Sequence, residues 1–239
     1  HYMRKKIITG SIIFLMTLGI VLYINLSDHN ELSAVQVANN PAITVDHYTE
    51  NKYFETSITL NAIGDLLIHS TVYNDARTGA GFDFNPMFKD IKYYLRNADI
   101  TIANQETVLG GTKIGLSTYP QFNSPQQLGD TLKESGVDIV SMANNHTLDR
   151  GEEAVISATN YLQNIGVEYV GAYQSEEDKN TQRIIHRKGI AVGFLSYTYG
   201  TNGIPVPEGK EHLVNLIDEE QILNDLEELK PNTDFIVVS

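Results

Sequence analysis

The 239-residue sequence contains no cysteine and no tryptophan. Without cysteine, the chain can form neither a disulfide nor a thiolate-ligated zinc or iron–sulfur site, and cysteine-based catalysis is excluded. Positive charge is also scarce, because 17 Lys and Arg face 30 Asp and Glu and the formal net charge is −13. Sequence-independent nucleic-acid binding depends on Lys and Arg side chains that release counterions from phosphates. We therefore expect no nucleic-acid partner.

The remaining composition is that of a folded protein. Hydrophobic residues make up 41% of the chain and charged residues 20%, which excludes disorder throughout. The length is sufficient for one large α/β domain or two small ones.

The N-terminal residues differ in charge from the rest. Three basic residues at positions 4–6 precede an uncharged run of 18 residues, 7–24. As a helix this run would span about 27 Å, close to the hydrocarbon thickness of a bilayer. The positive-inside rule then places the remaining chain, with its charge of −16 over residues 27–239, outside the cytoplasm. We predict a single-pass protein of the cell membrane, with a cytoplasmic basic segment 1–6 and a transmembrane anchor 7–26.

A cleaved signal peptide is the main alternative to this anchor. Such a peptide ends in a small-x-small cleavage site, and none follows the apolar run, because Leu32 lies two places before Ala34 and Gln36 two places before Ala38. A lipid-modified cysteine is excluded because the chain has no cysteine. An uncleaved anchor is therefore favoured.

The pattern of hydrophobic residues predicts a stalk followed by an α/β domain. Residues 27–55 are polar and show no sustained period, whereas residues 56–239 alternate short apolar runs with amphipathic segments, as in an α/β fold with a largely buried sheet. The predicted strands are 57–63, 100–103, 137–143, 167–170, 190–196 and 235–238. The predicted helices are 86–97, 125–135, 152–165 and 218–229. A turn at 187–189 predicts one hairpin within 182–197.

The last residues, DFIVVS, have the pattern of a buried strand with no polar tail behind it. Chain termini normally lie at the surface of a domain. We therefore expect that the sequence is a fragment and that further chain completes the fold.

Polar side chains follow three of the predicted strands, where functional groups gather in open α/β sheets. Carboxylate, amide and imidazole groups at one sheet edge would suit one or two divalent metal ions of the Mn, Fe or Zn type. Such a metal would polarise a phosphoryl or carbonyl oxygen and supply a hydroxide nucleophile. Asn145 and His146 are also candidate catalytic residues. The candidate metal ligands are Asp65, His69, Asn104, Glu106, Asn145 and His146.

Each of these residues also has a purely structural interpretation. Asp65 would cap the segment after it, and Asn104 and Asn145 would close turns at strand ends. Glu106 would be a solvated carboxylate and His69 a packed side chain. His146 is the strongest candidate ligand, because an imidazole directly after a buried strand and beside Asn can be oriented by its neighbours.

Three ordered motifs resemble the bacterial CapA (PgsA) capsule-synthesis family. They are GDLLIHSTV at 64–72, ANQETVLGG at 103–111 and ANNHTLDRG at 143–151. The segments YVGAY at 169–173 and GFLSYT at 193–198 are also similar to that family, so the resemblance extends from about residue 56 to the end of the sequence.

The resemblance implies a calcineurin-like metallophosphoesterase fold, which is an αββα sandwich. It also implies a membrane-anchored protein of capsule or poly-γ-glutamate synthesis or export. Asp65, Asn104 or Glu106, and Asn145 with His146 fall on motifs that correspond to phosphoesterase metal ligands. Leu67 stands where ordinary phosphoesterases have the His of Asp-x-His, and His69 is the nearby substitute.

Two later family motifs, His-Trp-Gly-x-Glu and Gly-His-His-Pro-His, are absent from these residues. We therefore expect an incomplete sandwich that lacks several metal ligands and is catalytically incomplete.

Three functions agree with these observations. In the first, the domain acts on the capsule polymer, its terminus or a phosphorylated carrier. In the second, it is a non-catalytic scaffold for a membrane polymer synthase or exporter. In the third, it is a general metal-dependent phosphoesterase of the cell surface. The expected partners are the membrane and the polymer or its synthase subunits. The charge of −16 would repel an acidic polymer unless metal ions or local Lys residues screened it, which favours the scaffold.

Overall fold

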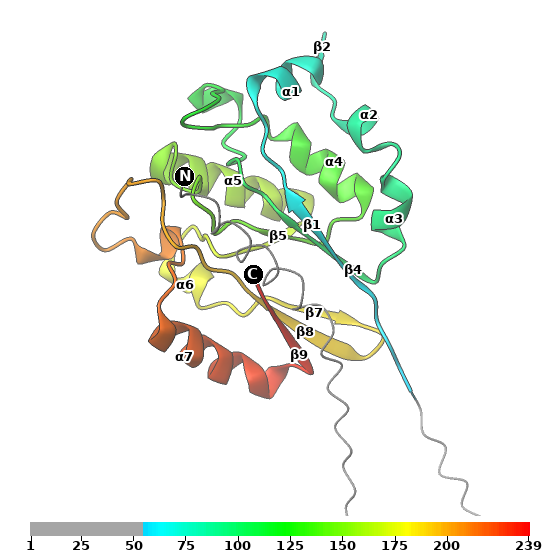
Figure 1. Cartoon of the computed structure of the whole chain (residues 1–239), viewed down its shortest axis with the longest axis vertical. Helices are drawn as coiled ribbons and strands as arrows, with labels where there is room; N and C mark the ends of the chain where they lie inside the picture. Colours follow the sequence, from blue (N-terminus) through cyan, green and yellow to red (C-terminus); the bar gives the residue numbers. More distant parts are fainter. Residues whose placement is uncertain (1–54) are drawn as a thin grey trace, which may run out of the picture. The chain divides into compact units, whose positions relative to one another are not determined.

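The computed structural model describes residues 55–239 (Figure 1). The predicted cytoplasmic segment 1–6, the anchor 7–26 and all but the last residue of the stalk 27–55 lie outside the described residues. None of the helices within residues 55–239 combines the length and the apolar character that a membrane span requires.

Four parallel strands form the first sheet, in the order β1-β4-β5-β6. Their bounds are Leu60–Asp65, Ile100–Asn104, Ile139–Ser141 and Glu168–Val170. Parallel strands need crossover connections, and those that follow β4 and β5 contain helices of nine and 15 residues. The predicted α/β class with a parallel sheet is confirmed.

Helices α4 (Gln127–Ser135) and α5 (Gly151–Ile165) cover one face of this sheet (Figure 1). Each has a buried stripe at helical spacing, and each ends at a left-handed glycine, which has no Cβ to oppose that conformation. The buried apolar residues of the stripes are Leu128, Leu132, Ala154, Val155, Ala158 and Leu162.

A second sheet has the order β7-β8-β9, with bounds Ile184–Arg187, Ile190–Leu195 and Phe235–Val238. Strands β7 and β8 are antiparallel and are joined by Lys188 and Gly189, both at positive φ, so the predicted hairpin is confirmed. Strand β9 pairs with β8 in parallel and forms the edge of the sheet.

The two sheets share one apolar core. Ile100, Ile102, Ile139 and Val170 of the first sheet belong to the same buried cluster as Ile185, Ile190, Val192 and Phe194 of the second. Because side chains alternate along a strand, the intervening residues Ala103, Val140 and Tyr169 point to the opposite face and join the core beneath α4 and α5.

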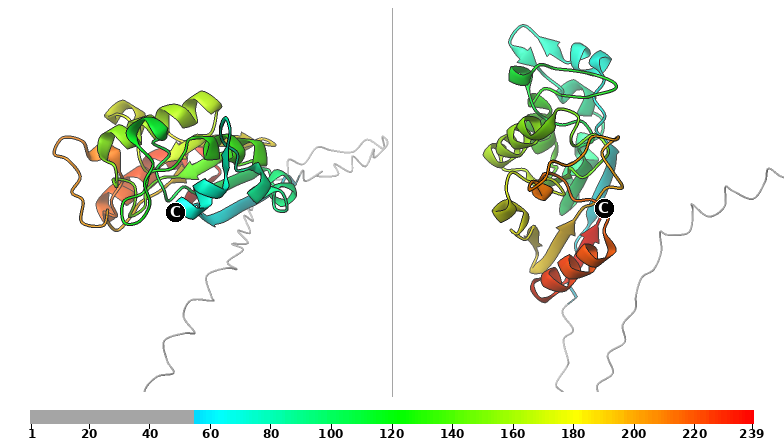
Figure 2. Two further views of the ribbon diagram at one scale, coloured as in Figure 1. Left: turned by 90° about the horizontal axis from the view of Figure 1, so that it is seen from above. Right: turned by 90° about the vertical axis from the view of Figure 1, so that its left-hand side faces the viewer.

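Helix α7 (Glu219–Leu229) lies on the outer face of the second sheet, where Leu229 contacts the backbone of Gly193. The resulting order of layers is helix, sheet, sheet, helix. In the right-hand view of Figure 2 the yellow strands β7 and β8 lie between the green helices and the red helix α7. This is the layering that the family resemblance implies.

Shorter elements surround the first sheet. The predicted helix 86–97 is in fact two helices, because the Ile91 N–H bonds to the Phe88 carbonyl three residues back and interrupts the helical ladder. Other short elements were not predicted, because each has too few residues to show a period. The short elements are α1 (Ser70–Asp75), β2 (Arg77–Thr78), β3 (Gly81–Phe82), α2 (Asn85–Phe88), α3 (Lys92–Arg96), α6 (Glu176–Lys179) and the 3₁₀ turns Thr112–Ile114, Glu211–Leu213 and Lys230–Asn232.

The strands β1 and β9 stand at sheet edges and are only partly covered. Leu60 of β1 is 38% exposed, and Phe235 and Val238 of β9 are 63% and 49% exposed. An apolar hollow of about 370 Å³ lies between the two strands and is lined mainly by aliphatic side chains, among them Ala62, Ile63, Val237 and Val238.

The contact between α7 and β8 leaves no room for a side chain at Gly193. A Cβ there would lie 2.6 Å from Cδ2 of Leu229 and 2.9 Å from Cγ2 of Thr233. We expect Gly193→Ala to lower the free energy of unfolding by about 1–3 kcal/mol, the usual cost of overpacking. Urea unfolding measures this, with Gly79→Ala as the control because a Cβ at Gly79 meets nothing within 4 Å. Equal midpoints for the two variants would contradict the packing of α7 on β8.

Candidate functional site

The carboxyl ends of β1 and β4 bring Asp65 and Asn104 together, as predicted. The Asn104 Nδ2 atom donates to Oδ1 of Asp65 over 2.7 Å. The next strand end contributes Asn144, whose Nδ2 atom donates to the Gln105 carbonyl at 3.0 Å and lies 3.4 Å from Oδ1 of Asn104. A chain of amides therefore joins the ends of three neighbouring strands.

Glu106 follows β4 and lies near Asp65. Its pKa is raised from the ordinary value, first by burial and then by the neighbouring Asp65 carboxylate, while the charge of His146 lowers it. The site thus contains two neighbouring carboxylates, which is the kind of pair that a cation stabilises.

The turn after β5 is closed by its own side chains. Oδ1 of Asn144 accepts from the His146 N–H at 2.9 Å, and Oγ1 of Thr147 accepts from the Asn144 N–H at 3.0 Å. Asn and Thr commonly replace backbone hydrogen bonds in this way. Asn144 therefore has the turn-closing role that sequence reasoning considered for Asn145, and the turn places His146 beside the end of the strand.

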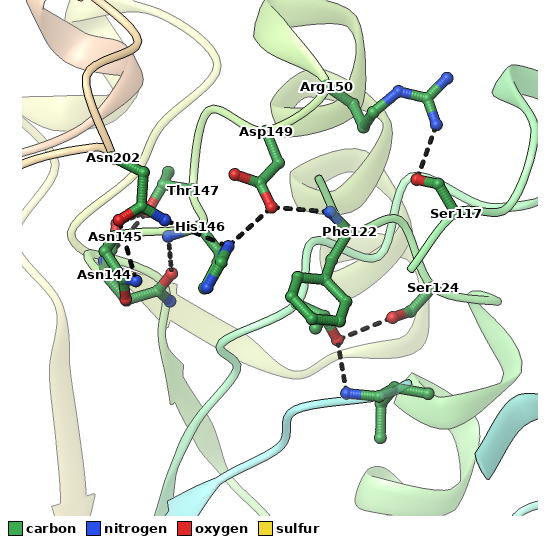
Figure 3. Close-up of polar contacts among 12 residues, drawn as sticks. Ser117, Phe122, Ser124, Asn144, Asn145, His146, Thr147, Asp149, Arg150 and Asn202 are labelled. Carbon is green, nitrogen blue, oxygen red and sulfur yellow. Dashed lines mark hydrogen bonds and ion pairs between the residues drawn. The ribbon is translucent and has the colours of Figure 1, made fainter. Parts of the chain in front are cut away.

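A buried carboxylate fixes the His146 ring (Figure 3). Oδ2 of Asp149 lies 2.7 Å from Nδ1 of His146 and also accepts from the Phe122 N–H at 2.7 Å. The Phe122 ring meets the imidazole edge to face, with centroids 4.8 Å apart. An ionised carboxylate can only accept, so Nδ1 carries the proton and Nε2 keeps its lone pair for a ligand or a proton.

Asn145 lies beside His146 but is held by a different part of the chain. Its Nδ2 atom donates to Oδ1 of Asn202 at 3.2 Å, and Nδ2 of Asn202 lies 3.4 Å from Nδ1 of His146 (Figure 3). Asn202 belongs to the segment that follows β8 of the second sheet. The site is therefore built from both sheets.

His69 contacts neither the carboxylates nor the amides of the site within the described residues. The His69 ring packs against the Phe122 ring, with centroids 5.0 Å apart. Nδ1 of His69 lies 3.4 Å from Oγ1 of Thr118. Phe122 thus contacts both His69 and His146. The packed role considered for His69 agrees with these contacts, and its role as a ligand stays a prediction.

The donor atoms fit a divalent cation in type but only partly in arrangement. Carboxylate oxygens, an amide oxygen and an imidazole nitrogen are ligands that Mn, Fe and Zn accept. Within residues 55–239, however, no three Asp, Glu or His side chains are placed to hold one ion. The structure brings Asp65, Asn104 and Glu106 together, and Asn145 with His146, without forming a complete metal centre from the described residues.

Sequence reasoning did not select Asp149, Phe122 or Asn202 as site residues. Asp149 had a usable signal, since it lies three residues after His146 and a helical turn brings such residues together. Phe122 and Asn202 had none, because they are 24 and 56 residues away from His146 in the sequence. Only the tertiary fold brings them to the site.

The fold and the site define an α/β protein with a polar site at the carboxyl edge of its parallel sheet. A sequence profile described as "Bacterial capsule synthesis protein PGA_cap" matches residues 59–239. The chain therefore belongs to the PGA_cap family of bacterial capsule synthesis proteins, and the predicted resemblance to the CapA family is confirmed.

Individual relatives are more distant. The chain is 24% identical over 173 residues to the capsule biosynthesis protein CapA of Bacillus anthracis, covering 70% of this chain and 40% of CapA. It is 29% identical over 145 residues to the uncharacterized protein y4sH of Sinorhizobium fredii, covering 58% of this chain and 30% of y4sH. The chain thus spans well under half the length of the curated relatives that it matches.

Among solved structures, the NAD nucleotidase NadN of Haemophilus influenzae is similar with a TM-score of 0.42 and 14% identity. The match covers 76% of this chain and 33% of NadN.

The contact between Asp149 and His146 can be measured by a double-mutant cycle. We expect Asp149→Ala and His146→Ala to be coupled by about 0.5–3 kcal/mol in the free energy of unfolding, as residues in one hydrogen-bonded network usually are. Asp149→Ala alone should be the more destabilising change, because it also leaves the buried Phe122 N–H without its acceptor. Additive effects of the two substitutions in urea unfolding would contradict the arrangement.

Proposed function

We propose that this chain is part of a membrane-anchored, extracytoplasmic protein of capsule or poly-γ-glutamate biosynthesis or export. The observation that carries the proposal is the family match over residues 59–239, because that range includes the whole candidate site. The apolar run 7–24 behind a basic triplet supports the anchor, and the positive-inside rule supports the orientation.

The candidate site supports a metallophosphoesterase-like role within that function. Asp65 and Glu106 are neighbouring carboxylates, and His146 has a fixed ring with Nε2 free. We propose that the Asp65 and Glu106 carboxylates, with the oxygen of Asn145, bind a divalent cation such as Mn²⁺. When bound, the cation would polarise a phosphoryl oxygen of the substrate. His146 would contribute a lone pair that Asp149 holds in place.

A non-catalytic scaffold remains the second candidate function. The observation that favours it is the charge of −16 over residues 27–239, which repels an acidic polymer. A scaffold for a membrane synthase or exporter requires no contact between the site and the polymer. A general cell-surface phosphoesterase is the third candidate and shares the proposed cation site.

Capsule output in a strain that carries the full-length gene separates these functions. We expect Asp65→Ala and His146→Ala to reduce capsule output at least tenfold if the site acts on the polymer or its carrier, because removal of a charge-stabilising group typically costs about 10²–10³ in rate. Capsule quantification, with immunoblots to confirm equal protein levels, makes the measurement. The control is His186→Ala, because His186 is exposed on β7.

Normal capsule output from both site variants, at equal protein levels, would overturn the enzymatic proposal and favour the scaffold. A loss of capsule in the His186→Ala strain would instead show that the assay reports general destabilisation.

Cation binding can be tested on the chain itself. We expect Mn²⁺ to bind at one site per chain at neutral pH, and Asp65→Asn to weaken binding because it removes a negative charge from the carboxylate pair. Electron paramagnetic resonance of free Mn²⁺ gives the affinity. The control is Asp99→Asn, because Asp99 is paired with Lys188 and precedes β4, at the opposite end of that strand from Asn104. Equal affinities for the two variants would contradict a cation site at Asp65.

A further inference from the structure

The turn that contains Asn202 has a counterpart elsewhere in the chain. Asn202 and Gly203 have φ values of 51° and 80°, and Lys188 and Gly189 of the β7-β8 hairpin have 51° and 82°. Left-handed backbone of this kind favours glycine and is tolerated by asparagine. Glycine would therefore serve the turn at position 202 at least as well as asparagine, so the turn alone does not require the Asn202 side chain.

The segment around Asn202 is anchored on both sides. The Thr198 N–H donates to the Asn215 carbonyl at 2.9 Å, and the Ile204 N–H donates to the Thr201 carbonyl at 2.9 Å. The Ile204 side chain packs against the core beneath the first sheet. Below the turn, Oγ of Ser196 lies 2.7 Å from Oγ of Ser141, so the ends of β8 and β5 are adjacent. The turn is thus held over the end of β5.

At that place the Asn202 side chain meets two site residues. Its Oδ1 atom accepts from Nδ2 of Asn145, which fixes the Asn145 amide with Oδ1 directed away from Asn202 (Figure 3). The Nδ2 atom of Asn202 lies 3.4 Å from Nδ1 of His146. This is the ring nitrogen that already donates to Asp149. Because Nδ1 carries a proton, this second approach is a packing contact that limits rotation of the ring.

We propose that Asn202 is a positioning residue of the site. With Asp149, it orients Asn145 and His146 so that Oδ1 of Asn145 stays available to a cationic ligand and Nε2 of His146 stays available as an acceptor. Neither acceptor atom has a hydrogen-bond partner within the described part of the chain. Removal of a group that hydrogen-bonds to a metal ligand and orients it typically lowers metal affinity by about 10–100-fold.

This inference deepens the proposed function and rests on its cation site. Three single variants of the chain test it. Asn202→Gly keeps the turn and removes the side chain. Asn202→Asp keeps an oxygen for Asn145 and places an acceptor next to the Nδ1 proton of His146. Lys188→Gly introduces the same residue at the matching position of the β7-β8 hairpin, which lies away from the site.

Two measurements are made on each variant: the Mn²⁺ affinity by electron paramagnetic resonance and the ¹⁵N spectrum of the His146 ring, assigned by comparison with His146→Ala. We expect Asn202→Gly to unfold at the same or a higher urea concentration than the parent chain, and to bind Mn²⁺ about tenfold more weakly. Asn202→Asp should bind Mn²⁺ as tightly as the parent chain or more tightly, and Lys188→Gly should leave the affinity unchanged.

Unchanged Mn²⁺ affinity in Asn202→Gly would overturn the inference, as would an equal loss in Lys188→Gly. If the parent chain binds no Mn²⁺, the proposed cation site fails, and the ring spectrum then decides the positioning role by itself. A His146 spectrum that shifts in Asn202→Gly and is restored in Asn202→Asp supports it. A spectrum identical to that of the parent chain in Asn202→Gly overturns it.

Discussion

The apolar contact between the two sheets is the constraint on which the rest of the structure depends. A parallel sheet must be buried on both faces, and here α4 and α5 cover one face while β7, β8 and β9 cover the other. Because β8 ends beside β5, the segment after β8 reaches the carboxyl edge of the first sheet. The same burial that stabilises the fold therefore delivers a side chain from the second sheet to the polar site.

The site illustrates how buried polar groups determine each other's state. Asp149 is 4% exposed and accepts from both a backbone N–H and an imidazole, so it fixes the tautomer of His146. Asn144 is turned inward to close the strand-end turn, while Asn145 is left free to face a ligand. The two adjacent asparagines thus have separate roles: Asn144 closes the turn that supports the site, and Asn145 lies at the surface of the site.

The α/β class could be predicted from the sequence because it depends on local patterns, whereas the layering of two sheets was implied only by the family resemblance. Alternation of apolar runs with amphipathic segments indicated an α/β domain with a largely buried sheet, and strand-end positions indicated that Asp65 and Asn104 would meet, as they do. The break at Phe88 in the predicted helix 86–97 was missed because it comes from a local change in hydrogen bonding that residue type does not encode. Asn202 was missed because its contact with Asn145 spans 57 residues and depends on how the two sheets pack.

The incompletely covered edge of the second sheet has a consequence for handling the protein. Strand β9 has the sequence FIVV, with no charge, no proline and two side chains about half exposed or more. Natural edge strands usually carry a lysine, a bulge or a proline, since a bare edge is a template for intermolecular pairing. The net charge of −13 opposes close approach of two chains at low ionic strength. Purification in high salt screens that repulsion and leaves β9 as the segment through which the chains would aggregate.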